Sequence, residues 1–270
     1  MWNAGDRLRM NALPAERTQK LFGWNPAWYK AATRAGLRGS RLEIGRPFPS
    51  LAKVYGVSLG TWMDQVVAGT LVDPDLLAAR ARPIARALER GRRLRIRDDH
   101  GTDLTLGLAH RPARMDVGRI SKADLKTPFG MLNLLPAGTV RVALDESVAD
   151  GTFVANRPSY NDVGLSTGGV FRFRHGRLVG HHFDTGSQFF DGDFRRGKQG
   201  RDRPGYVAFG LNPKLHNTPQ LEDREAGAIT VSVGSNRFIP GGKNRSPFSG
   251  IVVNVGARVE IDGRPLRLPG

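Results

Sequence analysis

Two adjacent histidines form one candidate site for acid–base or metal chemistry in this sequence. His181, His182 and Asp184 stand in the segment GHHFD, and on a strand His182 and Asp184 would share one face. Imidazole and carboxylate groups serve as acid, base or metal ligand. Adjacent histidines near a strand end are also typical of a polar surface patch, so both interpretations stay open.

Glu146 is the second candidate. If it is buried among apolar neighbours with an elevated pKa, it could act as a general base. If it accepts hydrogen bonds from the backbone or from arginine, it is a structural group. Asp145 precedes it and points to the opposite face of the same strand, which argues against a paired-carboxylate site.

Positive charge is the strongest signal in the composition. The 270 residues include 41 Lys plus Arg against 25 Asp plus Glu, which gives a formal net charge of +16 and a pI of about 11.1. Such a balance favours a polyanionic partner, for example tRNA, although arginine-rich usage also follows from a GC-rich genome. The residues that we expect to bind anions are Arg92, Arg93, Arg195, Arg196, Lys198 and Lys243.

The composition also excludes several classes of site. Without cysteine there is no disulfide, no thiolate nucleophile and no cysteine-ligated zinc. No apolar run approaches the length of a membrane span, and the first residues lack the apolar stretch of a signal peptide. We therefore expect a cytoplasmic protein with no membrane partner.

The elements that must position these side chains change character along the chain. Asp73-Pro74 is a helix start, apolar residues recur at helical spacing, and Gly91 is a stop, which predicts an amphipathic helix over 74–90. From residue 93 onward, short alternating segments predict strands, with hairpin turns at 175–177 and 262–264. Residues 191–205 are almost free of apolar side chains and predict a mobile basic loop. We expect an α+β fold with a mixed N-terminal lobe, 1–92, and a mostly β domain, 93–270.

Several segments resemble, in order and spacing, the thermophilic metalloaminopeptidase family of aminopeptidases T and S, which is leucyl aminopeptidase-like. The matching segments are GTDLT at 101–105, LPAG at 135–138, GT at 151–152, GLNP at 210–213, EDR at 222–224 and GGKN at 241–244. The resemblance covers roughly residues 50–270, and the first fifty residues do not clearly match the family's N-terminal domain. It implies an aminopeptidase-like scaffold and a homodimer.

The resemblance also implies a metal site that this sequence does not keep. Members of the family hold two divalent metals with two glutamates, two histidines and an aspartate, and the metals polarise the peptide carbonyl and activate a bridging water. Carried onto this sequence, the ligand positions are Glu146, Tyr206, Thr230, Ser249 and Ile251. Only the first is a carboxylate, and neither hydroxyls nor an aliphatic side chain replace imidazole or carboxylate ligands.

Four functional hypotheses follow from these observations, and they leave open whether the chain is an enzyme. The first is a homologue with a degenerate metal site that binds a peptide-like, aminoacyl or other anionic ligand, without a cofactor. The second is a metal-independent hydrolase or acyl transferase of amide or aminoacyl groups, acting for example on aminoacyl-tRNA, with Glu146 and His181 or His182 as base and acid. The third is an active metalloaminopeptidase with a rearranged site that binds zinc or cobalt. The fourth is a polyanion-binding module with no function in the old cleft.

Overall fold

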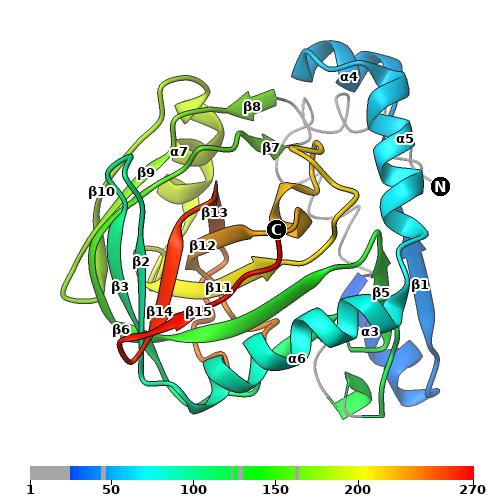
Figure 1. Cartoon of the computed structure of the whole chain (residues 1–270), viewed down its shortest axis with the longest axis horizontal. Coiled ribbons are helices and arrows are strands. Elements are labelled where there is room, and N and C mark those ends of the chain that lie inside the picture. Colours follow the sequence, from blue (N-terminus) through cyan, green and yellow to red (C-terminus); the bar gives the residue numbers. More distant parts are fainter. Residues whose placement is uncertain (1–24, 44–46, 123, 127–129, 162–163) are drawn as a thin grey trace.

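The computed structural model describes residues 25–43, 47–122, 124–126, 130–161 and 164–270. Helices gather in its N-terminal part, and the rest is a strongly curved β-structure (Figure 1). The helices before the main sheet are α3 (Asn25–Arg34), α4 (Pro49–Tyr55), α5 (Leu59–Thr70) and α6 (Pro74–Arg90). The α+β class predicted from the sequence is confirmed.

Helix α6 begins and ends where the sequence predicts. The carboxylate of Asp73 accepts a hydrogen bond from the backbone N–H of Asp75 at 2.9 Å, and Pro74 occupies the first turn, where no N–H is needed. Leu77 and Leu88 lie on the buried side of the helix and belong to the main core. Local capping and apolar spacing therefore agree with the packing.

Most strands belong to one sheet. They are β2 (Arg93–Arg97), β3 (Asp103–Leu108), β4 (Arg114–Asp116), β6 (Thr139–Val154), β9 (Val170–Arg174), β10 (Arg177–His182), β11 (Pro204–Gly210), β12 (Ala228–Gly234), β13 (Ser249–Val255), β14 (Arg258–Ile261) and β15 (Arg264–Leu266). The order along the sheet is β13-β12-β11-β6-β3-β2-β14-β15, with β4 and β9 also paired to β6 and β10 paired to β9.

Smaller elements complete the described part of the chain. A parallel pair joins β1 (Gly39–Leu42) to β5 (Leu132–Leu135), and an antiparallel pair joins β7 (Ser159–Asn161) to β8 (Gly164–Ser166). The remaining helices are η2 (Asp124–Lys126), α7 (Ser187–Arg196) and η3 (Glu222–Arg224). Helix α7 packs near β8 and β13, beside the curved sheet.

Strand β6 connects the two halves of the sheet. Its first half pairs with β4 and β11, and its second half pairs with β3 and β9. Because side chains alternate along a strand, Val140 and Val142 enter the main core with α6, whereas Thr139 and Arg141 face the other side. The sheet therefore has one apolar face and, over β6, β11, β12 and β13, one face with many polar groups.

A second apolar cluster joins the N-terminal helices to the loops after β11. Tyr55 of α4 and Trp62 of α5 pack there with Leu215 and Leu221.

Among the described residues, no helix is both long enough and apolar enough to cross a membrane.

Both predicted hairpin turns are confirmed. His175 and Gly176 have positive φ between β9 and β10, and Asp262 and Gly263 have positive φ between β14 and β15. Positive φ at both central residues is the pattern of a type I′ turn, which matches the twist of the flanking strands.

The prediction of a loop over 191–205 is wrong for its first part, because α7 extends to Arg196. Phe190 and Phe194, one helical turn apart, pack on each other and against Phe248, with ring centroids 5.3–5.5 Å apart. The apolar stripe that stabilises this helix begins before residue 191, so a window that starts there contains Phe194 as a single apolar residue and shows no helical spacing.

Candidate functional site

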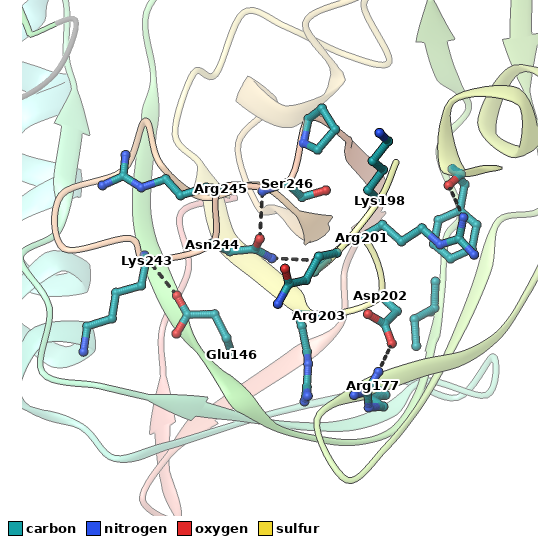
Figure 2. A pocket seen from close by; sticks show the side chains of 15 residues that line it. Glu146, Arg177, Lys198, Arg201, Asp202, Arg203, Lys243, Asn244, Arg245 and Ser246 are labelled. Atoms are coloured by element: carbon teal, nitrogen blue, oxygen red, sulfur yellow. Dashed lines mark hydrogen bonds and ion pairs between the residues drawn. The ribbon is translucent and has the colours of Figure 1, made fainter. Parts of the chain in front are cut away.

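A cavity of about 950 Å³ lies beside the bend of β6 and is lined mainly by polar and charged side chains (Figure 2). Its wall is formed by β6 at Glu146, the start of β10, Phe194 of α7 with residues 198–203 that follow this helix, and residues 243–247 before β13. The cavity therefore collects segments that lie far apart in the sequence.

Glu146 is fixed at one wall of the cavity by a buried arginine. The guanidinium of Arg111 donates two hydrogen bonds to its carboxylate, at 2.7 and 2.6 Å, and a third to the backbone oxygen of Leu144 at 2.6 Å. The side-chain amide of Asn236 and the backbone N–H of Lys243 donate to the same carboxylate, at 2.8 and 3.1 Å. Both carboxylate oxygens are thus occupied by donors from this chain.

These contacts decide the protonation state of Glu146. Burial by itself would raise its pKa, but the hydrogen bonds from Arg111 and Asn236 lower the pKa to about 2. A general base at neutral pH needs the opposite shift. Glu146 is therefore charged at neutral pH and anchors the residues around it.

The second carboxylate of the cavity is also neutralised by an arginine. Asp202 accepts a hydrogen bond from Arg177 at 2.6 Å. Arg201 donates to three backbone oxygens at the end of α7 and lies over the ring of Phe194, 4.7 Å from its centroid. Arg203 donates to the backbone oxygen of Gly176 at 3.2 Å. These three arginines therefore hold the wall in place.

Three further cationic side chains of the cavity are not paired with any described residue. Lys198, Lys243 and Arg245 have exposed side chains, and no residue that the structure describes accepts a hydrogen bond or ion pair from them. Figure 2 shows Lys243 and Arg245 on one side of the cavity and Lys198 on the other. Cationic side chains that are not paired within the protein are available to an anion.

The segment that carries Lys243 and Arg245 is fixed by two asparagines. The side-chain amide of Asn244 donates to the backbone oxygens of Gly200 and Gly234, at 2.7 and 2.8 Å, and its backbone N–H donates to the side chain of Asn236. A Cβ on Gly200 would lie 2.5 Å from the Asn244 side chain, so glycine is required for this approach. The GGKN segment noted in the sequence thus shapes the cavity.

The structure places neither predicted catalytic histidine in this cavity. His181 contacts Asp191 of α7 through Nε2 at 2.6 Å and packs on the ring of Phe190, 4.7 Å between centroids. His182 is exposed and contacts Asp184 at 3.2 Å. Both histidines therefore pair with aspartates of their own surroundings, and the structure does not bring them together with Glu146.

Of the predicted anion-binding residues, only Lys198 and Lys243 line the cavity. Arg195 and Arg196 lie in the last turn of α7, where Arg196 pairs with Asp193. Arg92 and Arg93 lie at the start of β2, an interior strand between β3 and β14, and do not line the cavity. The cavity also uses Arg177, Arg201, Arg203 and Arg245, which the sequence did not single out because isolated basic residues in turns carry no pattern.

Four of the five positions assigned to metal ligands by resemblance lie on the polar face of the sheet. Tyr206, Thr230, Ser249 and Ile251 share this face because the strand register pairs Ala208 with Thr230, Ser232 with Ile251, and Gly234 with Ser249. Glu146 lies three residues beyond Ala143, the partner of Tyr206, and is held by Arg111 instead. The structure does not bring Glu146 together with the other four.

An ion-pair network, which the sequence did not reveal, occupies this polar face. Arg141 contacts Asp116 at 3.3 Å and Asp223 at 3.0 Å, and Arg114 contacts Asp116 from the other side at 3.1 Å. Arg224 lies 3.8 Å from Asp223. These five side chains, which we call the inner charge network, come from β4, β6 and η3 and are at most 18% exposed.

Burial and charge act in opposite directions on the pKa of Asp116 in this network. Burial alone would raise the pKa of Asp116, but the positive charges of Arg141 and Arg114 lower it below its usual range. Burial raises the pKa of the neighbouring Tyr206 phenol. Beside the network, the Thr230 and Ser232 hydroxyls and Nε of Arg141 are buried and have no hydrogen-bond partner among the described residues.

The side chains at the positions assigned by resemblance do not fit a pair of divalent metals. They offer a phenol, two aliphatic hydroxyls, an aliphatic side chain and a carboxylate whose two oxygens already accept hydrogen bonds from Arg111. Within the described ranges, no group of three or more His, Asp or Glu side chains is placed to hold a metal ion.

Comparisons with known proteins agree on the fold. No family model matches the chain, and no curated protein matches it in sequence. It is similar to 2,5-dihydroxypyridine dioxygenase from Pseudomonas putida, with a TM-score of 0.63 and 18% identity over 92% of this chain and 74% of that one. It is also similar to AmpT from Thermus thermophilus, with a TM-score of 0.61 and 20% identity over 78% of this chain and 57% of that one.

The chain thus spans little more than half the length of AmpT. Identities this low carry fold and not activity, and the two similar proteins have different names for their functions. The distributed motifs noted in the sequence agree with the similarity to AmpT. The fold of this chain is aminopeptidase T-like, at a distant level of similarity.

Proposed function

We propose that this chain binds a multiply charged anionic ligand in the cavity beside β6, and that it does so without two-metal hydrolysis. One observation carries the proposal. Lys198, Lys243 and Arg245 surround a cavity of about 950 Å³ without partners among the described residues, while Glu146 and Asp202 are each neutralised by an arginine.

The arrangement leaves positive charge unused at the surface of the cavity. An anion that enters need not displace an existing ion pair, because the paired arginines already have their carboxylates. Arg245 can donate two parallel hydrogen bonds to a phosphate or carboxylate, and the two lysines act as point charges.

The size of the cavity favours a small ligand over a nucleic-acid duplex. Small-molecule sites span about 300–1,000 Å³, and this cavity lies near the upper end of that range. We propose a peptide-like or aminoacyl ligand that carries phosphate or carboxylate groups. A tRNA would enter this cavity with its aminoacyl end, while its phosphates contact basic residues outside.

A titration with matched variants tests the proposal. Inorganic pyrophosphate, a glutamyl dipeptide and an aminoacyl-tRNA are each titrated into the purified protein by calorimetry. For at least one of them we expect the variant K243E/R245E to bind about tenfold more weakly or worse. The control R92E/R93E makes the same change of charge away from the cavity and should bind as the unaltered protein does.

Two results would overturn the proposal. If R92E/R93E weakens binding as much as K243E/R245E, the chain attracts polyanions with its whole surface and the cavity has no special role. If none of the three probes binds, the cavity is not an anion site.

The hypothesis of a metalloaminopeptidase with a rearranged site has its own test. The protein is loaded with zinc, cobalt or manganese, dialysed, and analysed for metal and for release of amino acids from aminoacyl amides. Two tightly bound ions per chain with turnover would replace our proposal by that hypothesis.

A further inference from the structure

The polar face of the sheet buries positive charge beside the positions that resemblance assigns to metal ligands. Arg141 lies on β6 directly opposite Ala208 of β11, which in turn lies opposite Thr230 of β12. Its side chain therefore starts from the same face as Tyr206 and Thr230. The small side chain of Ala208 separates Arg141 from Thr230 along this row.

Arg141 is held between two acidic side chains on this face. Asp116 lies 3.3 Å from one terminal nitrogen and Asp223 lies 3.0 Å from the other. The two carboxylates come from different elements, β4 and η3, so the guanidinium joins segments that the strand ladder alone does not connect. Only 17% of the Arg141 side chain is exposed.

Burying this guanidinium costs free energy that its partners must offset. A buried charge is tolerated when it is paired and hydrogen-bonded, and arginine meets two carboxylates better than a point charge does. The attraction raises the pKa of Arg141 and lowers that of Asp116, although burial alone would act the other way on both. Asp116 and Arg141 therefore stay charged together.

We propose that the guanidinium of Arg141 is a built-in cation, which takes the central place between acidic side chains that a divalent metal ion would otherwise occupy on this face. A metal ion added to the unaltered protein would meet Arg141, Arg114 and Arg224 at short range, and their positive charges repel it. The fold thus keeps its acidic elements together without metal.

This inference is independent of the anion cavity, which lies beside Glu146 and contains no member of the inner charge network. Failure of one proposal therefore leaves the other standing. The two are separated experimentally because the first is read from anion binding and the second from melting temperature.

The test is rescue of a cation-deleted variant by small cations. In R141A, the melting temperature should fall, and either Mn²⁺ or methylguanidinium should raise it again by roughly 3 °C or more, since either can enter the space left between Asp116 and Asp223. R141Q keeps more of the side-chain packing and serves if R141A does not fold. R141K retains a positive charge and should show no response to Mn²⁺.

The outcomes divide clearly. Rescue of R141A or R141Q by either cation, with no Mn²⁺ response in R141K and the unaltered protein, supports the built-in cation. If neither cation raises the melting temperature of either neutral variant, the inference is wrong. A rise in the unaltered protein with Mn²⁺ that D223N abolishes would also overturn it, because a metal would then bind beside Arg141.

Discussion

Arg111 and Glu146 form a two-pronged ion pair, with both terminal nitrogens of the guanidinium within 2.7 Å of the two carboxylate oxygens. Arg111 is buried and Glu146 is 21% exposed at the wall of the cavity. The same carboxylate accepts hydrogen bonds from Asn236 and from the backbone of Lys243. This pair therefore fixes the segment that carries two of the free cations.

Removing the carboxylate should destabilise the protein strongly. In E146A the buried guanidinium of Arg111 loses its counter-charge, and we expect a loss of about 3 kcal/mol in the free energy of unfolding. E146Q keeps one acceptor and should lose less. Urea denaturation followed by circular dichroism measures both.

An exposed ion pair provides the matched control for that prediction. Asp103 also accepts two hydrogen bonds from one arginine, Arg95, but both side chains are about half exposed. D103A should therefore cost only about 0–1 kcal/mol. Equal losses in E146A and D103A would show that burial of Arg111 does not matter.

The lowered pKa of Glu146 predicts a specific pH dependence of stability. Its pKa falls from an ordinary value of 4.5 to about 2 in the folded protein, so the folded state prefers the charged form. The stabilisation is fully present above about pH 4.5 and is lost as the pH falls through 2. The difference in unfolding free energy between the unaltered protein and E146Q should therefore shrink from pH 5 to pH 2. A difference that stays constant over this range would contradict the prediction.

The sequence predicted those parts of the fold that local rules determine. The Asp73-Pro74 start and the Gly91 stop gave the bounds of α6, and His175-Gly176 and Asp262-Gly263 gave two hairpin turns, because caps and positive φ depend on neighbours in the chain. The sequence does not predict helix α7 because one of its two anchoring phenylalanines, Phe190, precedes the polar stretch and the other, Phe194, stands alone within it.

The site was less accessible from the sequence. Glu146 was recognised as a candidate, but its partner Arg111 lies 35 residues earlier and nothing local links them. The same holds for Arg141 of β6 and Asp223 of η3, which are 82 residues apart in the sequence. Ion pairs between distant segments follow from register, and register is set by packing of the whole sheet.

Arg201 should be essential for the wall of the cavity formed after α7. Its guanidinium donates to the backbone oxygens of Phe194, Arg195 and Gly197, which a helix end leaves without partners. In R201A we expect amide hydrogen exchange over 197–203 to become at least about tenfold faster. R195A, which removes an exposed arginine of the same helix, should leave exchange unchanged. Slow exchange in R201A would show that the segment is held by other contacts.

Asp262 connects the last hairpin to the start of β2. Its substitution should show whether its hydrogen bonds or its backbone conformation contributes more to stability. The carboxylate accepts hydrogen bonds from the backbone N–H groups of Arg92 and Arg93, at 2.9–3.2 Å, and the residue has a φ of 50°. D262A removes the acceptor and places at this positive φ a residue that tolerates it poorly, so the substitution should cost about 1–2 kcal/mol of the free energy of unfolding. D262G relieves the strain but still loses the acceptor, whereas D262N keeps an acceptor and tolerates positive φ. Because two backbone donors at the start of β2 depend on the acceptor, thermal melts should rank D262N above D262G and D262G above D262A. If D262G matches D262N, the backbone conformation alone accounts for the role of this residue.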